Sequence, residues 1–199
     1  EGIRAYQTED GVRVFKAEEH YERLLYSAKK MHLQFDYTVE QLVSLTYELL
    51  EKNQLKDAYI RPLIYVDAYM HLTPADKSNL FICAWEWDNL FSDKFLEVMT
   101  SSFQRPNPKS CFVEAKVTGH YTNSLLATNE AKVKGYDEAL LLDMNGNVAE
   151  GPGANFFYEK DAKLYTCPLG NILPGITRQT IFELAKELEV EIVEEYFTP

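Results

Sequence analysis

Apolar residues in the first part of the chain alternate between the spacing of strands and the spacing of helices. Residues 1–15 predict two strands around a turn at Asp10-Gly11. A helix is predicted next, because a set of apolar residues recurs at helical spacing and would share one face. The members of this set are Tyr21, Leu24, Leu25, Ala28 and Met31. Thr38 and Gln41 then have the spacing of a capping box, which predicts that a second helix starts at Thr38.

The second predicted helix would turn Leu42, Leu45 and Leu49 toward the core. Two apolar strands are predicted after it, over residues 58–66, where Pro62 interrupts the run, and over residues 79–85. The segment 86–94 is polar with scattered aromatic residues, so we interpret it as a linker.

The rest of the chain continues to mix strands, hairpins and helices. Extended segments are predicted over 98–102 and 110–115, and a helix over 123–134. Asn145-Gly146 is typical of a hairpin turn. A last helix is predicted from about Gly175, and its inner face would use Ile181, Leu184, Ala185 and Leu188. Strands alternate with helices but hairpins are frequent, which favours an α+β fold in two lobes.

Composition excludes several classes of function. Of the 199 residues 46% are hydrophobic, enough for a sizeable core, but no apolar run approaches the ~18 residues of a membrane span. The formal net charge is −11 and no basic face is evident, so we expect neither a nucleic-acid nor a membrane partner. We also expect no signal peptide. The three cysteines and four histidines lack metal-ligand spacing, so no metal site is predicted, and the cysteines fit buried thiols in a reducing cytosol.

Two stretches around glycine and proline are candidates for binding. Pro174-Gly175-Ile176-Thr177-Arg178 lies at the predicted helix start, where free backbone N–H groups and the helix dipole can bind an anion such as phosphate. The alternative is an N-cap loop without a ligand. The stretch from Glu150 to Asn155 predicts a tight bend that lets the backbone approach another group closely. Its alternative is a β-bulge with a surface glutamate.

Three basic residues are further candidates. Lys116 follows an apolar stretch and precedes Gly119-His120-Tyr121, so its amine could be partly desolvated and nucleophilic. Arg23 and Arg61 could each hold an anion by a bidentate contact. The alternative for Lys116 is a solvated lysine. For the two arginines it is surface ion pairs that contribute little to stability.

The order of these stretches along the chain resembles the branched-chain aminotransferase family, which are pyridoxal-phosphate enzymes of fold type IV. The resemblance runs over the whole chain. It rests on EGIRAY, HYERLLYSAKK, AYIRPLI, AKVTGHYTNSLLATNEAKVKGYDEALLLD, GNVAEGPGANFF and LPGITRQT.

The resemblance implies roles for individual residues. Lys116 matches the catalytic lysine that holds pyridoxal 5'-phosphate as an internal aldimine. Tyr121 matches the tyrosine that bonds the phenolic oxygen of the cofactor, and Glu150 the carboxylate that faces the pyridine nitrogen. The phosphate contacts match Arg23, Ile176 and Thr177, and the substrate-binding positions match Arg4, Tyr59 and Arg61.

The resemblance also implies a domain organisation. We expect a small N-terminal α/β domain over 1–86 that lacks its first strand, an interdomain loop over 87–97, and a large cofactor-binding domain over 98–199 that is incomplete at its C-terminus. The architecture would therefore be truncated at both ends. Two departures from the family pattern bear on substrate specificity: Ala154 stands where the family often has Glu, and Asp88-Asn89-Leu90-Phe91 replaces a more typical glycine-containing stretch.

The function implied is transamination of branched-chain L-amino acids (Leu, Ile, Val) with 2-oxoglutarate, by ping-pong kinetics, in amino-acid biosynthesis in the cytoplasm. A homodimer is implied as well. Two alternatives within the fold are a D-amino acid aminotransferase and an aminodeoxychorismate lyase. A third alternative, of another class, is a non-catalytic fragment or interaction module.

Overall fold

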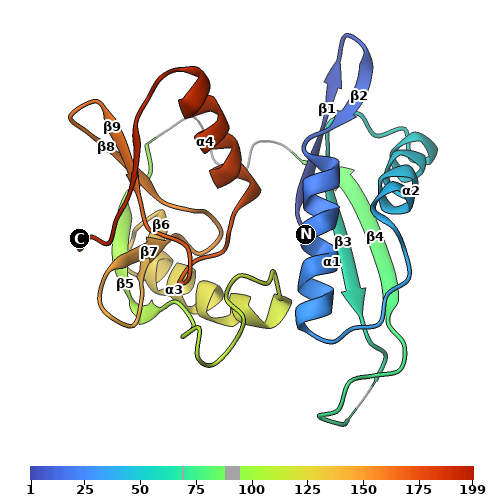
Figure 1. The fold of residues 1–199 in the computed structure, drawn as a ribbon, viewed down its shortest axis with the longest axis horizontal. Coiled ribbons are helices and arrows are strands. Elements are labelled where there is room, and N and C mark those ends of the chain that lie inside the picture. The colour runs from blue at the N-terminus through green and yellow to red at the C-terminus, as the bar shows by residue number, and fades with distance from the viewer. Residues whose placement is uncertain (69, 88–94) are drawn as a thin grey trace. The chain divides into compact units, whose positions relative to one another are not determined.

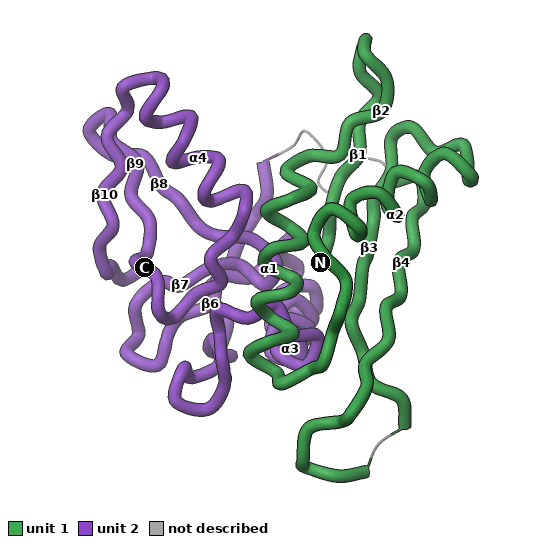
Figure 2. Tube along the Cα trace, turned by 45° about the vertical axis from the view of Figure 1, so that its right-hand side comes forward, with its two compact units in different colours: residues 1–93 green, residues 94–199 purple. Residues whose placement is uncertain are grey.

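A computed structural model describes residues 1–68, 70–87 and 95–199. The chain divides into two compact units, Glu1–Asp93 (unit 1) and Lys94–Pro199 (unit 2), and each is described by itself (Figure 2). Most of the expected linker, and the whole of Asp88-Asn89-Leu90-Phe91, lie outside the described residues. Among the helices of the described residues, none is long and apolar enough to cross a membrane.

Unit 1 is an antiparallel sheet with two helices. The strand order is β2-β1-β3-β4 (Figure 1), with β1 at Ile3–Thr8, β2 at Gly11–Val14, β3 at Ala58–Tyr65 and β4 at Asn79–Glu86. The predicted turn at Asp10-Gly11 is confirmed, and Gly11 has the positive φ of 102° that glycine adopts without strain. Pro62 does not interrupt its strand. It lies beyond the residues that β1 pairs, where only β4 continues the ladder.

The two helices of unit 1 cover one face of this sheet. They are α1 (Ala17–Lys30) and α2 (Val39–Lys52). The predicted capping box is present, since the Thr38 hydroxyl accepts from the Gln41 N–H and the Gln41 side chain accepts from the Thr38 N–H. Alternate residues of the strands pack with the helices in one apolar cluster. Its buried members include Ile3, Ala5, Tyr21, Leu24, Leu42, Leu50, Ala58 and Ile60. The opposite face of the sheet therefore carries side chains that the core does not use.

Unit 2 contains two small sheets, each with one helix that joins parallel strands. In the first, β5 (Val98–Gln104) runs parallel to β6 (Glu138–Leu142) through α3 (Tyr121–Val133), and β7 (Val148–Glu150) pairs antiparallel to β6. The predicted turn at Asn145-Gly146 joins β6 to β7. The buried Asp143 carboxylate accepts the N–H groups of Asn145 and Asn147 there.

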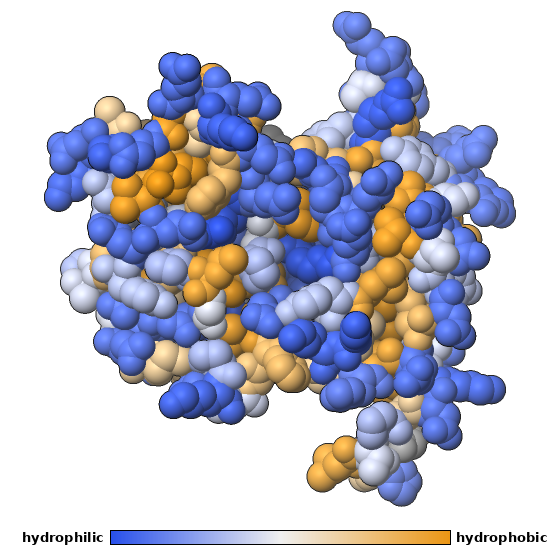
Figure 3. Space-filling model, in the orientation of Figure 1, coloured by the Kyte–Doolittle hydropathy of each residue, from blue (hydrophilic) through white to orange (hydrophobic). Residues whose placement is uncertain are grey.

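In the second sheet the antiparallel hairpin comes first along the chain, and the parallel pair joined by a helix follows it. β8 (Phe157–Lys160) and β9 (Lys163–Thr166) form a hairpin, and β9 runs parallel to β10 (Ile192–Glu194) through α4 (Ile176–Glu187). Leu184 and Leu188 are 49% and 72% exposed, so the predicted inner face of this helix is wrong at these positions. Figure 3 shows hydrophobic side chains at the surface around β8, β9 and α4. Residues 110–115 are not a strand but a run of turns that leads into the 3₁₀-helix η1 (Thr118–His120).

Candidate active site

Lys116 and Tyr121 form the first contact of the candidate site in unit 2. Lys116 directly follows the run of turns and precedes η1, and Tyr121 is the first residue of α3. The single turn of η1 brings the two side chains together, so that the Lys116 Nζ donates to the Tyr121 hydroxyl at 2.6 Å. The ammonium also lies 5.1 Å from the centroid of the Tyr121 ring. The predicted pair is therefore in direct contact.

Glu150, the last residue of β7, presents a buried carboxylate to the same site. It is 5% exposed. Its Oε2 accepts from the Asn155 Nδ2 at 2.8 Å, and its Oε1 accepts from the Leu173 N–H at 3.2 Å. Glu150 and Asn155 also form an isolated antiparallel bridge across the bend between them. The glycine-rich bend thus fixes the carboxylate in the interior, and the alternative of a surface glutamate is wrong.

The charge of Glu150 is set by opposing effects. Burial raises the pKa of this carboxyl to about 7, against the positive charges of Arg105 and Lys116, which lower it. The Arg105 Nε lies 2.9 Å from the Glu150 Oε1, and both side chains are almost fully buried. A group that titrates near neutrality and faces two cations responds strongly to any further charge beside it.

Asn155 connects Glu150 to the start of α4. Its Nδ2 also donates to the Leu173 carbonyl at 2.9 Å, just before the helix. Gly175 is the N-cap residue, and a Cβ there would lie 1.9 Å from the Asn155 Oδ1, so only glycine permits this approach. The described first turn of α4, which begins with Ile176 and Thr177, contains no acidic residue. Its backbone N–H groups and the helix dipole can therefore bind an anion.

Arg23 belongs to unit 1, where it lies on α1 in a buried charged cluster. Its Nε donates to the Glu1 Oε1 at 3.0 Å and its Nη2 to the Glu1 Oε2 at 2.5 Å, while the His20 Nδ1 lies 2.9 Å from Glu1. Burial favours the neutral carboxyl of Glu1, but the hydrogen bonds from His20 and Arg23 outweigh it and lower its pKa to about 2. A bidentate carboxylate contact fixes the plane of the guanidinium.

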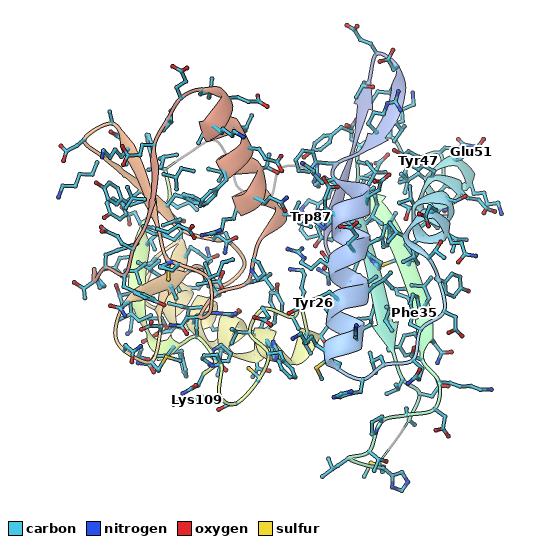
Figure 4. All side chains as sticks on the ribbon, viewed as in Figure 1. Tyr26, Phe35, Tyr47, Glu51, Trp87 and Lys109 are labelled. Atoms are coloured by element: carbon cyan, nitrogen blue, oxygen red, sulfur yellow. The ribbon has the colours of Figure 1, made fainter. Side chains whose placement is uncertain are left out.

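Arg4, Tyr59 and Arg61 share the sheet face of unit 1 that the helices leave uncovered. Arg4 pairs with Tyr59 across β1 and β3, and Arg61 follows two residues later on the same face. The Arg61 Cζ lies 5.5 Å from the Tyr59 ring and 5.9 Å from the Trp85 ring. Trp87, labelled in Figure 4, stacks on Trp85 with ring centroids 5.5 Å apart. This face therefore combines guanidinium groups with an aromatic surface, which suits a ligand that has both a carboxylate and an apolar part.

The sequence-based prediction missed three residues with contacts in these places, Arg105, Asn155 and Trp85. Arg105 stands in the loop Arg105-Pro106-Asn107-Pro108 after β5, between the extended segments predicted over 98–102 and 110–115. Asn155 ends the predicted tight bend, where polar residues close to glycine could have suggested a contact. Among the described residues, no cluster of His, Cys, Asp and Glu side chains could hold a metal ion.

Comparison with known proteins points to one family of enzymes. The family model described as amino-transferase class IV matches residues 1–199. A branched-chain-amino-acid aminotransferase from Escherichia coli (strain K12) is 39% identical over 203 residues, which cover 98% of this chain and 66% of that relative. This chain thus spans about two thirds of the length of the curated relatives it matches.

Solved structures agree with the sequence comparison. The crystal structure of the Escherichia coli branched-chain amino acid aminotransferase has a TM-score of 0.96 and 38% identity, and the match covers 100% of this chain and 68% of that one. The T.th. branched-chain amino acid aminotransferase complexed with N-(5'-phosphopyridoxyl)-L-glutamate has a TM-score of 0.89 and 35% identity. That match covers 100% of this chain and 66% of the other.

Proposed function

Since this chain belongs to the amino-transferase class IV family, we propose that the protein transfers amino groups between branched-chain L-amino acids and 2-oxoglutarate with pyridoxal 5'-phosphate as cofactor. The observation that carries the proposal is the contact of Lys116 with Tyr121, in the same unit as the buried carboxylate of Glu150. Relatives named branched-chain-amino-acid aminotransferase support the choice of substrates.

The residues of unit 2 fit this cofactor on their own chemistry. A lysine amine held by a tyrosine hydroxyl suits an aldehyde and its phenolic oxygen. A buried carboxylate suits a ring nitrogen that carries a proton, because an opposite charge stabilises the cationic form. The start of α4, with Ile176 and Thr177, suits a phosphate. Arg23 would supply a further phosphate contact, with Glu1 fixing its orientation.

Each of the residues at the site would have a separate role in the reaction. When bound, pyridoxal phosphate supplies an electron sink for negative charge at the substrate Cα. Lys116 would hold the cofactor, and its amine would serve as the base that removes the substrate Cα proton. Tyr121 orients this amine. Glu150 would stabilise a proton on the ring nitrogen, which would make the ring a better acceptor of electrons.

Substrate recognition would use the uncovered sheet face of unit 1. Arg4 and Arg61 would bind substrate carboxylates, and Tyr59 would contact the substrate between them. The T.th. relative was solved with N-(5'-phosphopyridoxyl)-L-glutamate, which is consistent with 2-oxoglutarate and glutamate as the second pair. We further propose a small domain over 1–86, an interdomain loop over 87–97 and a cofactor-binding domain over 98–199, in a cytoplasmic homodimer that acts in branched-chain amino-acid biosynthesis.

The activity is tested with the full-length protein and pyridoxal phosphate. Leucine with 2-oxoglutarate should give glutamate, faster than D-alanine gives pyruvate and faster than aminodeoxychorismate is cleaved. Pyruvate from D-alanine without glutamate from leucine would show a D-amino acid aminotransferase instead, and cleavage of aminodeoxychorismate alone would show a lyase.

The role of Lys116 is tested separately by visible absorbance spectroscopy. The protein with cofactor should have a visible absorbance band that borohydride removes, and Lys116→Ala should lack that band. Lys109→Ala is the matched control, since Lys109 is an exposed lysine in the same unit (labelled in Figure 4), and it should keep the band. A reducible band in Lys116→Ala would contradict the assignment. A protein that stays colourless with added cofactor would support a non-catalytic fragment.

A further inference from the structure

Arg105 is anchored beside Glu150 in the interior of unit 2. Its backbone N–H donates to the Leu142 carbonyl of β6 at 2.9 Å, which fixes the residue at the end of β5. Its side chain is 8% exposed and approaches the Glu150 Oε1 to 2.9 Å. Both groups are thus nearly removed from water, where a charge interacts more strongly with its neighbours than at the surface.

The contact between these two side chains is a charge contact more than a hydrogen bond. Although the Arg105 Nε is close to the carboxylate, its N–H is not aligned for a bond, and among the described residues this buried atom has no hydrogen-bond partner. The position of the Glu150 carboxylate is fixed by two other donors, the Asn155 amide and the Leu173 N–H. Arg105 therefore adds a positive charge to a carboxylate that is already held in place.

The other charged and titratable groups near Glu150 do not replace this charge. Lys116, from the loop before η1, is the other cation that stabilises the ionised carboxylate, but it contributes less than Arg105 does. Cys167, after β9, is a thiol whose pKa burial raises to about 11. His120, at the end of η1, lies near Arg105, and burial and that positive charge lower the pKa of its imidazole. Arg105 is thus the principal fixed positive charge opposite Glu150.

We propose that Arg105 acts through Glu150: its charge favours the ionised carboxylate and, through it, a proton on the ring nitrogen of the cofactor. The second part rests on the proposed function, while the first concerns the chain alone. In the proposed reaction the amine of Lys116 bonds to the cofactor or takes up the substrate proton, so its charge changes. The charge of Arg105 stays beside Glu150 during the whole reaction.

The first test uses the cofactor-free, full-length protein. The protonation of Glu150 is followed by infrared difference spectroscopy over pH, with Glu150→Gln used to assign its carboxyl band. Arg105→Met should move the titration midpoint upward by at least about one pH unit, the usual effect of removing an adjacent opposite charge. Arg105→Lys, which keeps a positive charge, should return the midpoint most of the way to that of the parent protein. Arg178→Met removes a different buried arginine, which pairs with Glu194, and should leave the midpoint unchanged.

Folding failure is itself informative when the double variant is included. Arg105→Met leaves a buried carboxylate without its main counter-charge, whereas Arg105→Met with Glu150→Gln does not. If only the single variant fails to fold, the charge role is supported. An unchanged midpoint in a folded Arg105→Met protein, or failure of both variants to fold, would overturn the proposal.

A second measurement uses the protein with pyridoxal phosphate. The pH dependence of the visible band should change on Arg105→Met when Glu150 is present and should not change in the Glu150→Gln background. A change that is equal in both backgrounds would show that Arg105 does not act through Glu150. If no band forms in any protein, the proposed function fails, yet the carboxyl titration still decides whether Arg105 controls Glu150.

Discussion

The substitution Glu150→Gln should change how the stability of the cofactor-free protein depends on pH. Glutamine keeps the shape of the side chain but removes its titration. In the native protein the Glu150 carboxyl has a pKa raised by burial from 4.5 to about 7. In the unfolded chain the same carboxyl is in water and returns to its ordinary pKa. The native state therefore binds more protons than the unfolded state between these two values.

The sign and size of the effect follow from this difference. Because the native state holds the extra proton, the free energy of unfolding falls as pH rises from 4.5 to about 7. Well below pH 4.5 the Glu150 carboxyl is protonated in both the native and the unfolded state, so it causes no further change. The pKa difference is about 2.5, and at about 1.4 kcal/mol per pH unit the loss amounts to about 3 kcal/mol. The Gln variant has no such loss, so its stability relative to the parent should rise by about this amount between pH 4 and pH 8.

Urea unfolding of both proteins at a series of pH values measures this difference. The contributions of other titrating groups are common to both proteins and cancel in the comparison. Any hydrogen bond that glutamine makes less well than the carboxyl adds an offset that does not vary with pH. A stability difference that stays constant over this pH range would refute the assignment of a raised pKa to Glu150.

Three further substitutions test other contacts of the described residues. Gly2→Ala should displace the Tyr59 ring, because a Cβ at position 2 would lie 2.1 Å from the Tyr59 Oη, and the change is measured by fluorescence of the adjacent tryptophans and by a raised KM. Thr46→Val should cost about 1–3 kcal/mol in urea unfolding, because it leaves the buried Tyr21 hydroxyl without the partner it has in Thr46. Glu130→Gln should remove a stabilisation that the parent protein has above pH 4.5 and loses as pH falls toward 2, since hydrogen bonds, first from Lys134, lower the Glu130 pKa to about 2. Acid titration followed by circular dichroism checks this, and equal acid midpoints for the two proteins would contradict it.

Features that depend on neighbours in the sequence were predicted well. The turn at Asp10-Gly11, the capping box at Thr38 and the turn at Asn145-Gly146 are each confirmed, because local backbone preferences determine them. The contact of Lys116 with Tyr121 is of the same kind, since one turn of 3₁₀-helix separates them.

Features that depend on distant partners were predicted less well. Helical spacing placed Leu45 and Leu184 on inner faces, but both are exposed, because spacing identifies a face without showing how much of it another element covers. Residues 110–115 are apolar enough for a strand, yet no neighbouring strand pairs with them among the described residues. Arg105 was missed for the same reason, since it becomes significant only when folding brings it to Glu150.

The pH experiments on Glu150 and Arg105 test two opposing effects on the pKa of Glu150. Burial favours the neutral carboxyl of Glu150, while the charge of Arg105 favours the ionised form, and a pKa near 7 means that neither effect dominates at neutral pH. A protonated ring nitrogen facing the carboxylate would add a second positive charge and complete its ionisation. Binding of the cofactor should therefore release a fraction of a proton from the parent protein near pH 7, measurable by calorimetry in buffers of different ionisation enthalpy. The Glu150→Gln variant lacks this contribution, so its proton release should differ from that of the parent protein. Equal proton release from both proteins would show that Glu150 is not the group that responds to the cofactor.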